Sequence, residues 1–194
     1  MYLFFDVETN GLPFNRNAPA SDVDNWPRLV QIAWLLCEEI NQPIAEASFI
    51  IKPNGKFIIP LNARRVHHIS TERAEAEGVP CREALEAFMA VVPKARYLVA
   101  HNMAFDFSVV GAEFHRIRGA VPRSLHSKSQ ICTMLASADH CQLPGNYRNN
   151  YKWPLLEELY MKLFKTRLKH AHDALKDVHA CAKCFFELKD LRVV

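Results

Sequence analysis

The sequence predicts one α/β domain with a mixed sheet. Short apolar runs of strand length alternate with longer segments in which apolar residues recur at helical spacing. The turn-forming sequence Asn41-Gln42-Pro43 joins two of the strand candidates, which predicts a hairpin and therefore one antiparallel strand. The length of 194 residues suits a single domain, so we expect residues 1–194 to fold as one unit.

The first three strands are expected near the N-terminus. The apolar run at residues 2–5 ends at Asp6 and Glu8, and it is typical of a buried strand with carboxylates at its C-terminal end. Residues 29–36, which are rich in Val, Ile and Trp, predict the second strand. Residues 47–52 predict the third, so that a strand is followed by a hairpin.

Four later segments carry apolar residues on one helical face, and short apolar runs at residues 97–100 and 129–133 predict the fourth and fifth strands between them. Pro154 is a favourable start for the third helix, and Asp173 is a natural N-cap for the last. The four stripes consist of Ala84, Leu85, Phe88, Met89 and Val92; Phe107, Val110, Phe114 and Ile117; Leu155, Leu156, Leu159, Tyr160, Leu163 and Phe164; and Leu175, Val178, Ala182, Phe185 and Leu188.

Two long polar segments interrupt this order, at residues 14–27 and 137–152. Loops of this length inside a compact domain are usually functional or disordered. The chain contains no internal repeat, low-complexity tract or linker, which again favours one domain.

The charge of the chain is distributed unevenly. Residues 1–50 hold two basic and seven acidic residues, a balance of −5, whereas the remaining 144 hold 22 basic and 14 acidic residues, a balance of +8. No apolar stretch approaches the roughly 20 residues of a membrane span. Asp6 and Glu8 also stand where a signal peptide would be basic. We therefore expect a cytoplasmic protein with no membrane partner.

The six cysteines are expected to be reduced thiols, because most of them lie inside apolar periodic segments without the spacing of a disulfide framework. Cys181 and Cys184 form a lone C-x-x-C pair on a predicted helix. A zinc or redox site is the alternative, but no second pair accompanies them.

Carboxylates at the end of the first strand are the first candidate functional group. Asp6 and Glu8 are two residues apart on a strand, so both side chains project from the same face. They repel each other unless a cation lies between them, and Mg²⁺ prefers such oxygen ligands. The alternative is a pair of solvated acids.

Two further acids occur in comparable places. Asp106 follows the fourth strand and lies in the first turn of a helix, beside the buried stripe of that helix. The alternative is that the acid only interacts favourably with the positive end of the helix dipole. Asp177 lies about one turn into the last helix, next to its apolar face, and His172 lies just outside that helix. A single histidine in such a place is more often a structural hydrogen-bonding residue than a catalyst, so His172 by itself does not identify an active site.

Together, three separated segments form a specific pattern. They are Phe4-Phe5-Asp6-Val7-Glu8-Thr9-Asn10-Gly11-Leu12-Pro13, Ala100-His101-Asn102-Met103-Ala104-Phe105-Asp106, and residues 172–177, with the histidine five residues before the last aspartate. Over about residues 2–190 the chain resembles the DEDDh (DnaQ-like) family of 3′→5′ exonucleases. It departs from that pattern mildly, with Asn10 where many members have Thr and His68 where many have Gly.

The resemblance implies a ribonuclease H-like fold with a central mixed five-stranded sheet, one strand of it antiparallel, flanked by helices. It also implies phosphodiester hydrolysis with two ions of Mg²⁺ (or Mn²⁺) per active site. Asp6, Glu8 and Asp177 would hold the first ion, Asp6 would bridge to the second, and Asp106 would act directly or through water. His172 would be the general base that accepts a proton from the attacking water.

The family also implies a single strand that enters by its 3′ end, with bases against apolar groups. We expect Leu12 to touch the terminal base, although anchoring of the loop is the alternative reading of this residue. Asn102 and Phe105 flank the second acidic motif and could line the same cleft, and Thr9 belongs to the first motif. His67 is expected to contact the terminal nucleotide through the resemblance alone.

The expected activity is therefore release of nucleoside 5′-monophosphates from single-stranded nucleic acid 3′ ends, with DNA favoured over RNA. The alternatives are a proofreading subunit of a DNA polymerase and an oligoribonuclease or other RNA-trimming exonuclease. An endonuclease of similar fold and a non-catalytic nucleic-acid-binding module are weaker alternatives. The sequence leaves both a monomer and a homodimer as alternatives. A polymerase partner is not supported by a C-terminal tail, since the chain stops just beyond its last helix.

Overall fold

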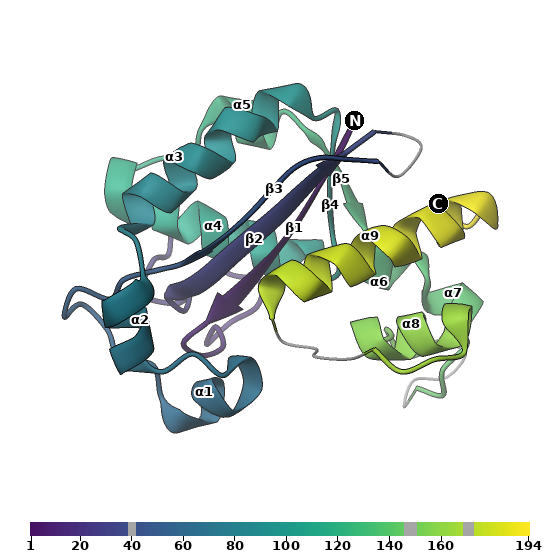
Figure 1. The fold of residues 1–194 in the computed structure, drawn as a ribbon, viewed down its shortest axis with the longest axis horizontal. Coiled ribbons are helices and arrows are strands. Elements are labelled where there is room, and N and C mark those ends of the chain that lie inside the picture. Colours follow the sequence, from purple (N-terminus) through teal and green to yellow (C-terminus); the bar gives the residue numbers. More distant parts are fainter. Residues whose placement is uncertain (39–41, 146–150, 169–172) are drawn as a thin grey trace.

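Five strands form one sheet at the centre of the protein (Figure 1). The computed structural model describes residues 1–38, 42–145, 151–168 and 173–194. The strand order is β3-β2-β1-β4-β5; β2 pairs antiparallel with both of its neighbours, and β1 pairs parallel with β4 and β4 with β5. The mixed sheet with one antiparallel strand is therefore confirmed. The strands are β1 (Tyr2–Thr9), β2 (Leu29–Cys37), β3 (Pro43–Ile50), β4 (Tyr97–Ala100) and β5 (Ser129–Cys132).

Helices cover both faces of the sheet (Figure 1). Side chains of β1 alternate between the faces: Leu3 and Phe5 pack in the cluster that includes Phe88 of α3, whereas Phe4 packs in the cluster that includes Phe185 of α9. In the described part of the chain the helices are α1 (Leu61–His67), α2 (Thr71–Glu77), α3 (Cys81–Val91), α4 (Met103–Arg118), α5 (Arg123–His126), α6 (Thr133–Ala136), α7 (Ala138–Cys141), α8 (Leu156–Phe164) and α9 (Ala174–Asp190), with a 3₁₀ turn at Val92–Lys94.

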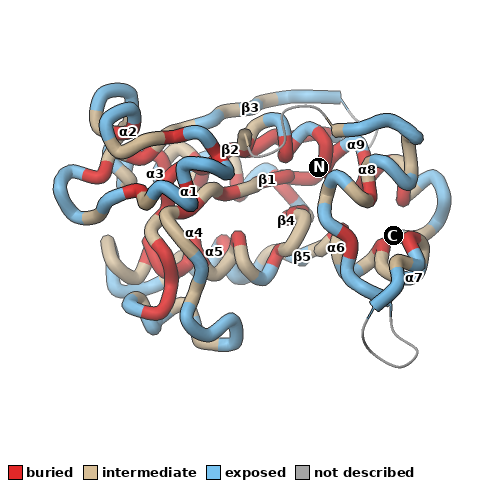
Figure 2. Tube along the Cα trace, turned by 90° about the horizontal axis from the view of Figure 1, so that it is seen from below, coloured by how far each residue is buried: buried red, intermediate tan, exposed pale blue. Residues whose placement is uncertain are grey.

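The central strands carry the core. Every residue of β2 is buried, and every residue of β1 is buried except Asp6 and Glu8, which are half-buried. The edge strand β3 is mostly exposed or intermediate, and Figure 2 shows this contrast along the chain. On the outer side of α9, Leu159 of α8 packs against Cys184 and Leu188.

Strand β1 extends beyond the end of its parallel pairing with β4, and this extension carries the two carboxylates. The pairing of β1 with β4 runs from Tyr2 to Phe4, so Asp6 and Glu8 lie beyond the last paired residue of that ladder. The partner strand on the other side is β2, which continues to Leu29 opposite Thr9 across a register shift. Open α/β sheets bind ligands at such carboxyl ends of parallel strands.

Several boundaries differ from those expected. The first strand is twice as long as residues 2–5, because the acids that end the apolar run still pair with β2. The third begins at Pro43 instead of residue 47 and ends at Ile50, and Ile51 then forms an isolated bridge with Val79. Val92 lies in the 3₁₀ turn after α3 although it is buried as expected.

Helices α1 and α2 were not predicted, because each has seven residues and too few buried positions to show a period. The expected loop at 137–152 contains the one-turn helix α7, and its residues 146–150 lie outside the described part of the chain. The loop at 14–27 has neither helix nor strand, as predicted.

A buried ion cluster holds the loop at 14–27 against the domain. The Glu113 carboxylate of α4 accepts hydrogen bonds from Arg28 Nε and from an Arg116 guanidinium nitrogen, both at 2.8 Å. The Arg116 guanidinium in turn donates to the backbone carbonyls of Val23 and Trp26. The loop is thereby tied to α4, and its Trp26 lies 6.4 Å, between ring centroids, from Phe105 at the other end of that helix.

All six cysteines are free thiols. Burial raises the pKa of Cys181 well above its ordinary value and that of Cys184 to about 12, so neither thiol is poised to ionise. Among the described helices, none combines the length and the apolar character needed to cross a membrane.

Candidate active site

Three of the expected carboxylates meet at the C-terminal half of β1. One oxygen from each of Asp6, Glu8 and Asp177 lies within 4.8 Å of the other two. Asp6 and Glu8 come from the same face of β1, and Asp177 comes from the first turn of α9. Residues far apart in the sequence are thus brought to one point of the fold.

The start of α9 determines where Asp177 lies. The Asp173 side chain accepts hydrogen bonds from the backbone N–H groups of Leu175 and Lys176, which confirms the predicted N-cap. The helix therefore begins at Ala174, and Asp177 N–H donates to the Asp173 carbonyl at 2.9 Å. The cap directs Asp177 one turn into the helix, toward β1.

Gln31 is a positioning residue that the sequence did not reveal. It lies opposite Glu8 in the β1–β2 ladder, and its side-chain oxygen accepts from Ala174 N–H at 3.4 Å. Its amide nitrogen donates to Ser48 Oγ at 3.0 Å. This buried glutamine links the start of α9 to the strand beside Glu8. The only signal for it was a polar residue inside an apolar run.

Asp106 lies buried in the first turn of α4, outside the group of three. One of its carboxylate oxygens accepts a hydrogen bond from Val7 N–H at 3.2 Å. Val7 lies between Asp6 and Glu8, so this bond joins α4 to the carboxylate-bearing segment of β1. Asp106 is close enough to the other acids to raise the pKa of Asp6.

The acids repel one another, and burial adds to the cost of their charges. Burial first, and then the charges of Asp106, Glu8 and Asp177, hold the pKa of Asp6 well above its ordinary value. Burial and then Asp177 and Asp173 raise the pKa of Glu8 to about 8, and burial raises the pKa of Asp106. A hard divalent cation would offset these costs, so the oxygen donors fit Mg²⁺ or Mn²⁺.

A cavity of about 460 Å³ is lined by residues of the two segments that follow β1 and β4. Three of the expected substrate contacts line it: Leu12, which is largely exposed, Asn102 and Phe105. Phe105 directly precedes Asp106, and Leu12 lies four residues after Glu8, so two walls of the cavity come from the segments that carry the acids, although none of the four acids lines it. The volume falls in the range of about 300–1,000 Å³ that is typical of ligand pockets.

The other two expected contacts have internal hydrogen bonds. Thr9 is buried, and its hydroxyl donates to the Gly11 carbonyl at 2.7 Å, which shapes the turn after β1. His67 is buried at the end of α1, and its Nδ1 accepts from Ile69 N–H at 3.1 Å. His68 follows with φ of 60°, the left-handed region that favours glycine. Contact of Thr9 and His67 with a nucleotide stays a prediction.

His172, the expected general base, lies outside the described residues. A different histidine stands out in the structure. His101 is half-buried, with Nδ1 at 3.0 Å from Thr133 Oγ1 and Nε2 at 2.9 Å from the Pro154 carbonyl. Burial lowers the pKa of His101 to about 4. Although His101 belongs to the second motif, its role as a link to residue 154 had no sequence signal.

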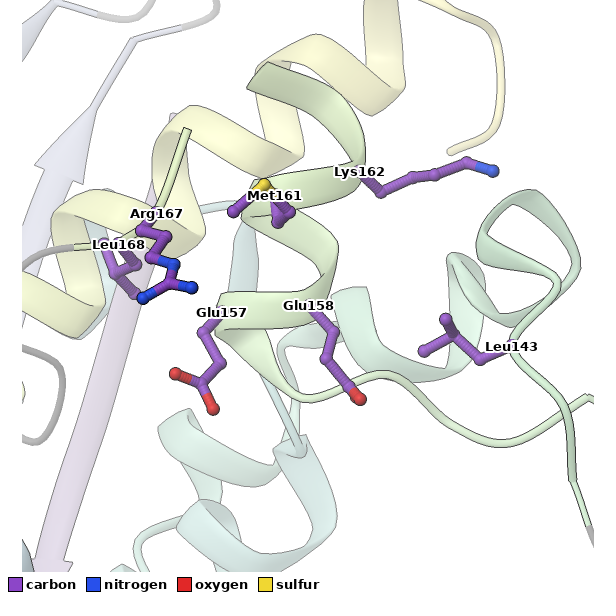
Figure 3. A pocket seen from close by; sticks show the side chains of 7 residues that line it. All are labelled: Leu143, Glu157, Glu158, Met161, Lys162, Arg167 and Leu168. Atoms are coloured by element: carbon purple, nitrogen blue, oxygen red, sulfur yellow. The ribbon is translucent and has the colours of Figure 1, made fainter. Parts of the chain in front are cut away.

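A second cavity, of about 500 Å³, runs along α8 (Figure 3). It contains none of the expected site residues, and charges of both signs line it. Its size alone therefore does not make it the functional site. Its lining consists of Leu143, Glu157, Glu158, Met161, Lys162, Arg167 and Leu168.

A sequence model of the family described as "Exonuclease" (RNase_T) matches residues 3–185 of the chain. The chain belongs to this exonuclease family. The match includes the segments of all four acids and of His172, and it confirms the resemblance to DEDDh exonucleases. No curated protein sequence is similar enough to count as a match.

Solved structures with the same fold include complexes of Escherichia coli exonuclease I. A zinc-bound complex of that enzyme with single-stranded DNA matches with a TM-score of 0.76 and 23% identity, over 99% of this exonuclease-family chain and 41% of that chain. A complex with a dA16 oligonucleotide matches with a TM-score of 0.75 and 22% identity, over 99% and 42%. The chain thus spans about two fifths of the length of these structures, and the likeness confirms the ribonuclease H-like fold.

Proposed function

We propose that the protein is a metal-dependent exonuclease that shortens single-stranded nucleic acid from the 3′ end and releases nucleoside 5′-monophosphates. The observation that carries this proposal is the convergence of Asp6, Glu8 and Asp177 in a chain of the exonuclease family. The similar exonuclease I structures hold DNA oligonucleotides, which favours DNA over RNA as the substrate. The homodimer, the polymerase partner and the cytoplasmic location stay predictions.

The acidic residues would divide the metal binding between them. Asp6, Glu8 and Asp177 would hold one Mg²⁺ or Mn²⁺ ion, and Asp6 and Asp106 would hold a second. A pair of such ions stabilises both the attacking and the leaving oxygen of an in-line displacement. The Asp106 carboxylate accepts a hydrogen bond from Val7 N–H, and this bond would keep Asp106 oriented toward β1 during the reaction.

The chain's other residues would orient the substrate and move protons. Leu12, Asn102 and Phe105 would hold the strand in the cavity beside the acids. His172 would take the proton from the water that attacks phosphorus. The bond from phosphorus to the 3′-oxygen of the preceding nucleotide then breaks, and that oxygen takes a proton from solvent.

The test of this function is a gel of 5′-labelled single-stranded DNA and RNA of the same sequence, with Mg²⁺ or with EDTA. We expect a ladder of shortening from the 3′ end, with mononucleotide release measured by chromatography, in Mg²⁺ alone. A closed circular single strand should stay intact. Opening of the circle would instead identify an endonuclease, and binding without metal-dependent shortening would identify a non-catalytic module.

Replacing His172 with alanine should lower kcat about a hundredfold while metal binding is retained, because loss of a general base typically costs 10²- to 10⁴-fold. The remaining activity should rise with pH, as hydroxide replaces the lost base. The measurement is the pH profile of kcat at saturating Mg²⁺, compared with a His140→Ala variant. A His172→Ala profile that matches the wild type would remove the proposed base.

A further inference from the structure

Trp153 lines the same cavity as Leu12, Asn102 and Phe105 from the first two acidic motifs, although none of the three motifs includes it. Its side chain is 59% exposed, whereas the other two tryptophans, Trp26 and Trp34, are 4% and 3% exposed. It shares the cavity with Leu12 and Phe105. A large aromatic side chain left in water at the edge of a cavity is typical of a binding surface.

Hydrogen bonds on both sides hold the backbone at Trp153. Lys152 N–H donates to the Leu143 carbonyl at 3.0 Å, and the Pro154 carbonyl accepts from His101 Nε2 at 2.9 Å. Since Nε2 must carry the proton to donate to a carbonyl, His101 Nδ1 is the acceptor for the Thr133 hydroxyl at 3.0 Å. An exposed ring on a fixed backbone loses little conformational freedom when it binds a ligand.

The other walls of the cavity suit a nucleotide. Leu12 and Phe105 are apolar, Asn102 offers an amide, and Arg16 supplies a positive charge at the same cavity. Single strands are generally bound by aromatic rings that stack on bases and by cations that pair with phosphates.

We propose that Trp153 is a base-stacking residue, whose indole face receives one base of the single strand that is bound at the acidic site. The inference rests on the proposed exonuclease function and extends it, because it names a residue that determines the substrate form. A base inside a duplex has both faces covered by its neighbours, so stacking on Trp153 selects unpaired 3′ ends. Base identity has little influence, since every base has a π-face.

The kinetic test compares Trp153→Ala and Trp153→Phe with the wild type on a short single-stranded oligonucleotide. We expect Trp153→Ala to raise KM about tenfold with kcat nearly unchanged, and Trp153→Phe to restore most of the affinity, because a stacked base contributes roughly 1–3 kcal/mol. Three further substrates, each with a single abasic site at one of the last three positions, identify the base that stacks on Trp153. For one of these substrates, the KM of the wild type should rise to that of Trp153→Ala. If the KM of Trp153→Ala stays tenfold above that of the wild type for all three substrates, or if the variant loses only kcat, the stacking role is overturned.

Fluorescence provides a readout that does not require hydrolysis. Trp26 also lines the cavity, but it is 4% exposed and Trp34 is buried elsewhere in the core, so quenching of tryptophan emission by an added oligonucleotide in EDTA should come mainly from Trp153. The quenching should largely disappear in Trp153→Phe, and equal quenching in that variant would contradict the inference. If the wild type itself shows no metal-dependent shortening, the proposed function fails; if it shortens strands and Trp153→Ala has the same KM, this inference alone fails.

Discussion

Replacing Asp6 with asparagine should abolish nucleotide release and, at the same time, stabilise the metal-free protein. Asp6 is the acid that all the others surround, since Asp106, Glu8 and Asp177 each raise its pKa. Loss of the residue predicted to touch both metal ions should lower kcat by at least about a thousandfold. Removal of one negative charge from this half-buried group of acids should raise the free energy of unfolding by about 1–2 kcal/mol, or the Tm by about 2–8 °C.

The measurements are the rate of mononucleotide release in Mg²⁺ and the thermal denaturation midpoint in EDTA. Asp139→Asn is the matched control, because Asp139 is exposed on α7 and its change should leave both quantities nearly unaltered. Wild-type activity in Asp6→Asn would refute the metal-site assignment. A lower Tm of that variant in EDTA would show that repulsion among the acids is not what limits stability.

Burial of the acids, together with their repulsion, gives the metal-free protein a defined pH dependence. The pKa of Glu8 is raised from 4.5 to about 8 in the folded protein, so between these values the folded state holds a proton that the unfolded chain has lost. The stability contributed by this proton is complete below the unfolded pKa and is lost as pH rises through the folded pKa. The Tm in EDTA should therefore fall between about pH 5 and pH 8, and less steeply in Asp6→Asn.

The sequence predicted the site in outline because its parts follow local rules. Alternation along a strand placed Asp6 and Glu8 on one face, and a capping aspartate at residue 173 fixed the turn that carries Asp177. The meeting of these segments followed from the family resemblance. The sheet order, by contrast, depends on pairings between β1 and β4 that no local pattern specifies.

What the sequence did not predict depends on long-range contacts. Gln31 was one polar residue in a buried strand until its bond to Ala174 N–H linked it to the start of α9. Trp153 and His101 lie 52 residues apart, and their relation exists only because Pro154 comes back to the end of β4. Such contacts have no period and no spacing, so they become visible only in the folded chain.

Replacing Glu113 with alanine should cost about 3–5 kcal/mol of the free energy of unfolding, which is a large share of the roughly 5–15 kcal/mol of an ordinary domain. The side chain is 1% exposed, and its carboxylate accepts from Arg28, from Arg116 and from the backbone N–H of Leu29. Its removal leaves the partly buried guanidinium groups of Arg28 and Arg116 near each other with no anion between them.

The measurement is urea denaturation of Glu113→Ala beside Glu86→Ala, which breaks the half-exposed ion pair with Arg118 and should cost less than about 1 kcal/mol. Equal losses in the two variants would contradict the role of the buried cluster. Because Arg116 also holds the carbonyls of Val23 and Trp26, Glu113→Ala should loosen the loop at 14–27 and raise the KM for single strands as well. The cluster would then stabilise both the domain and the wall of its substrate cavity.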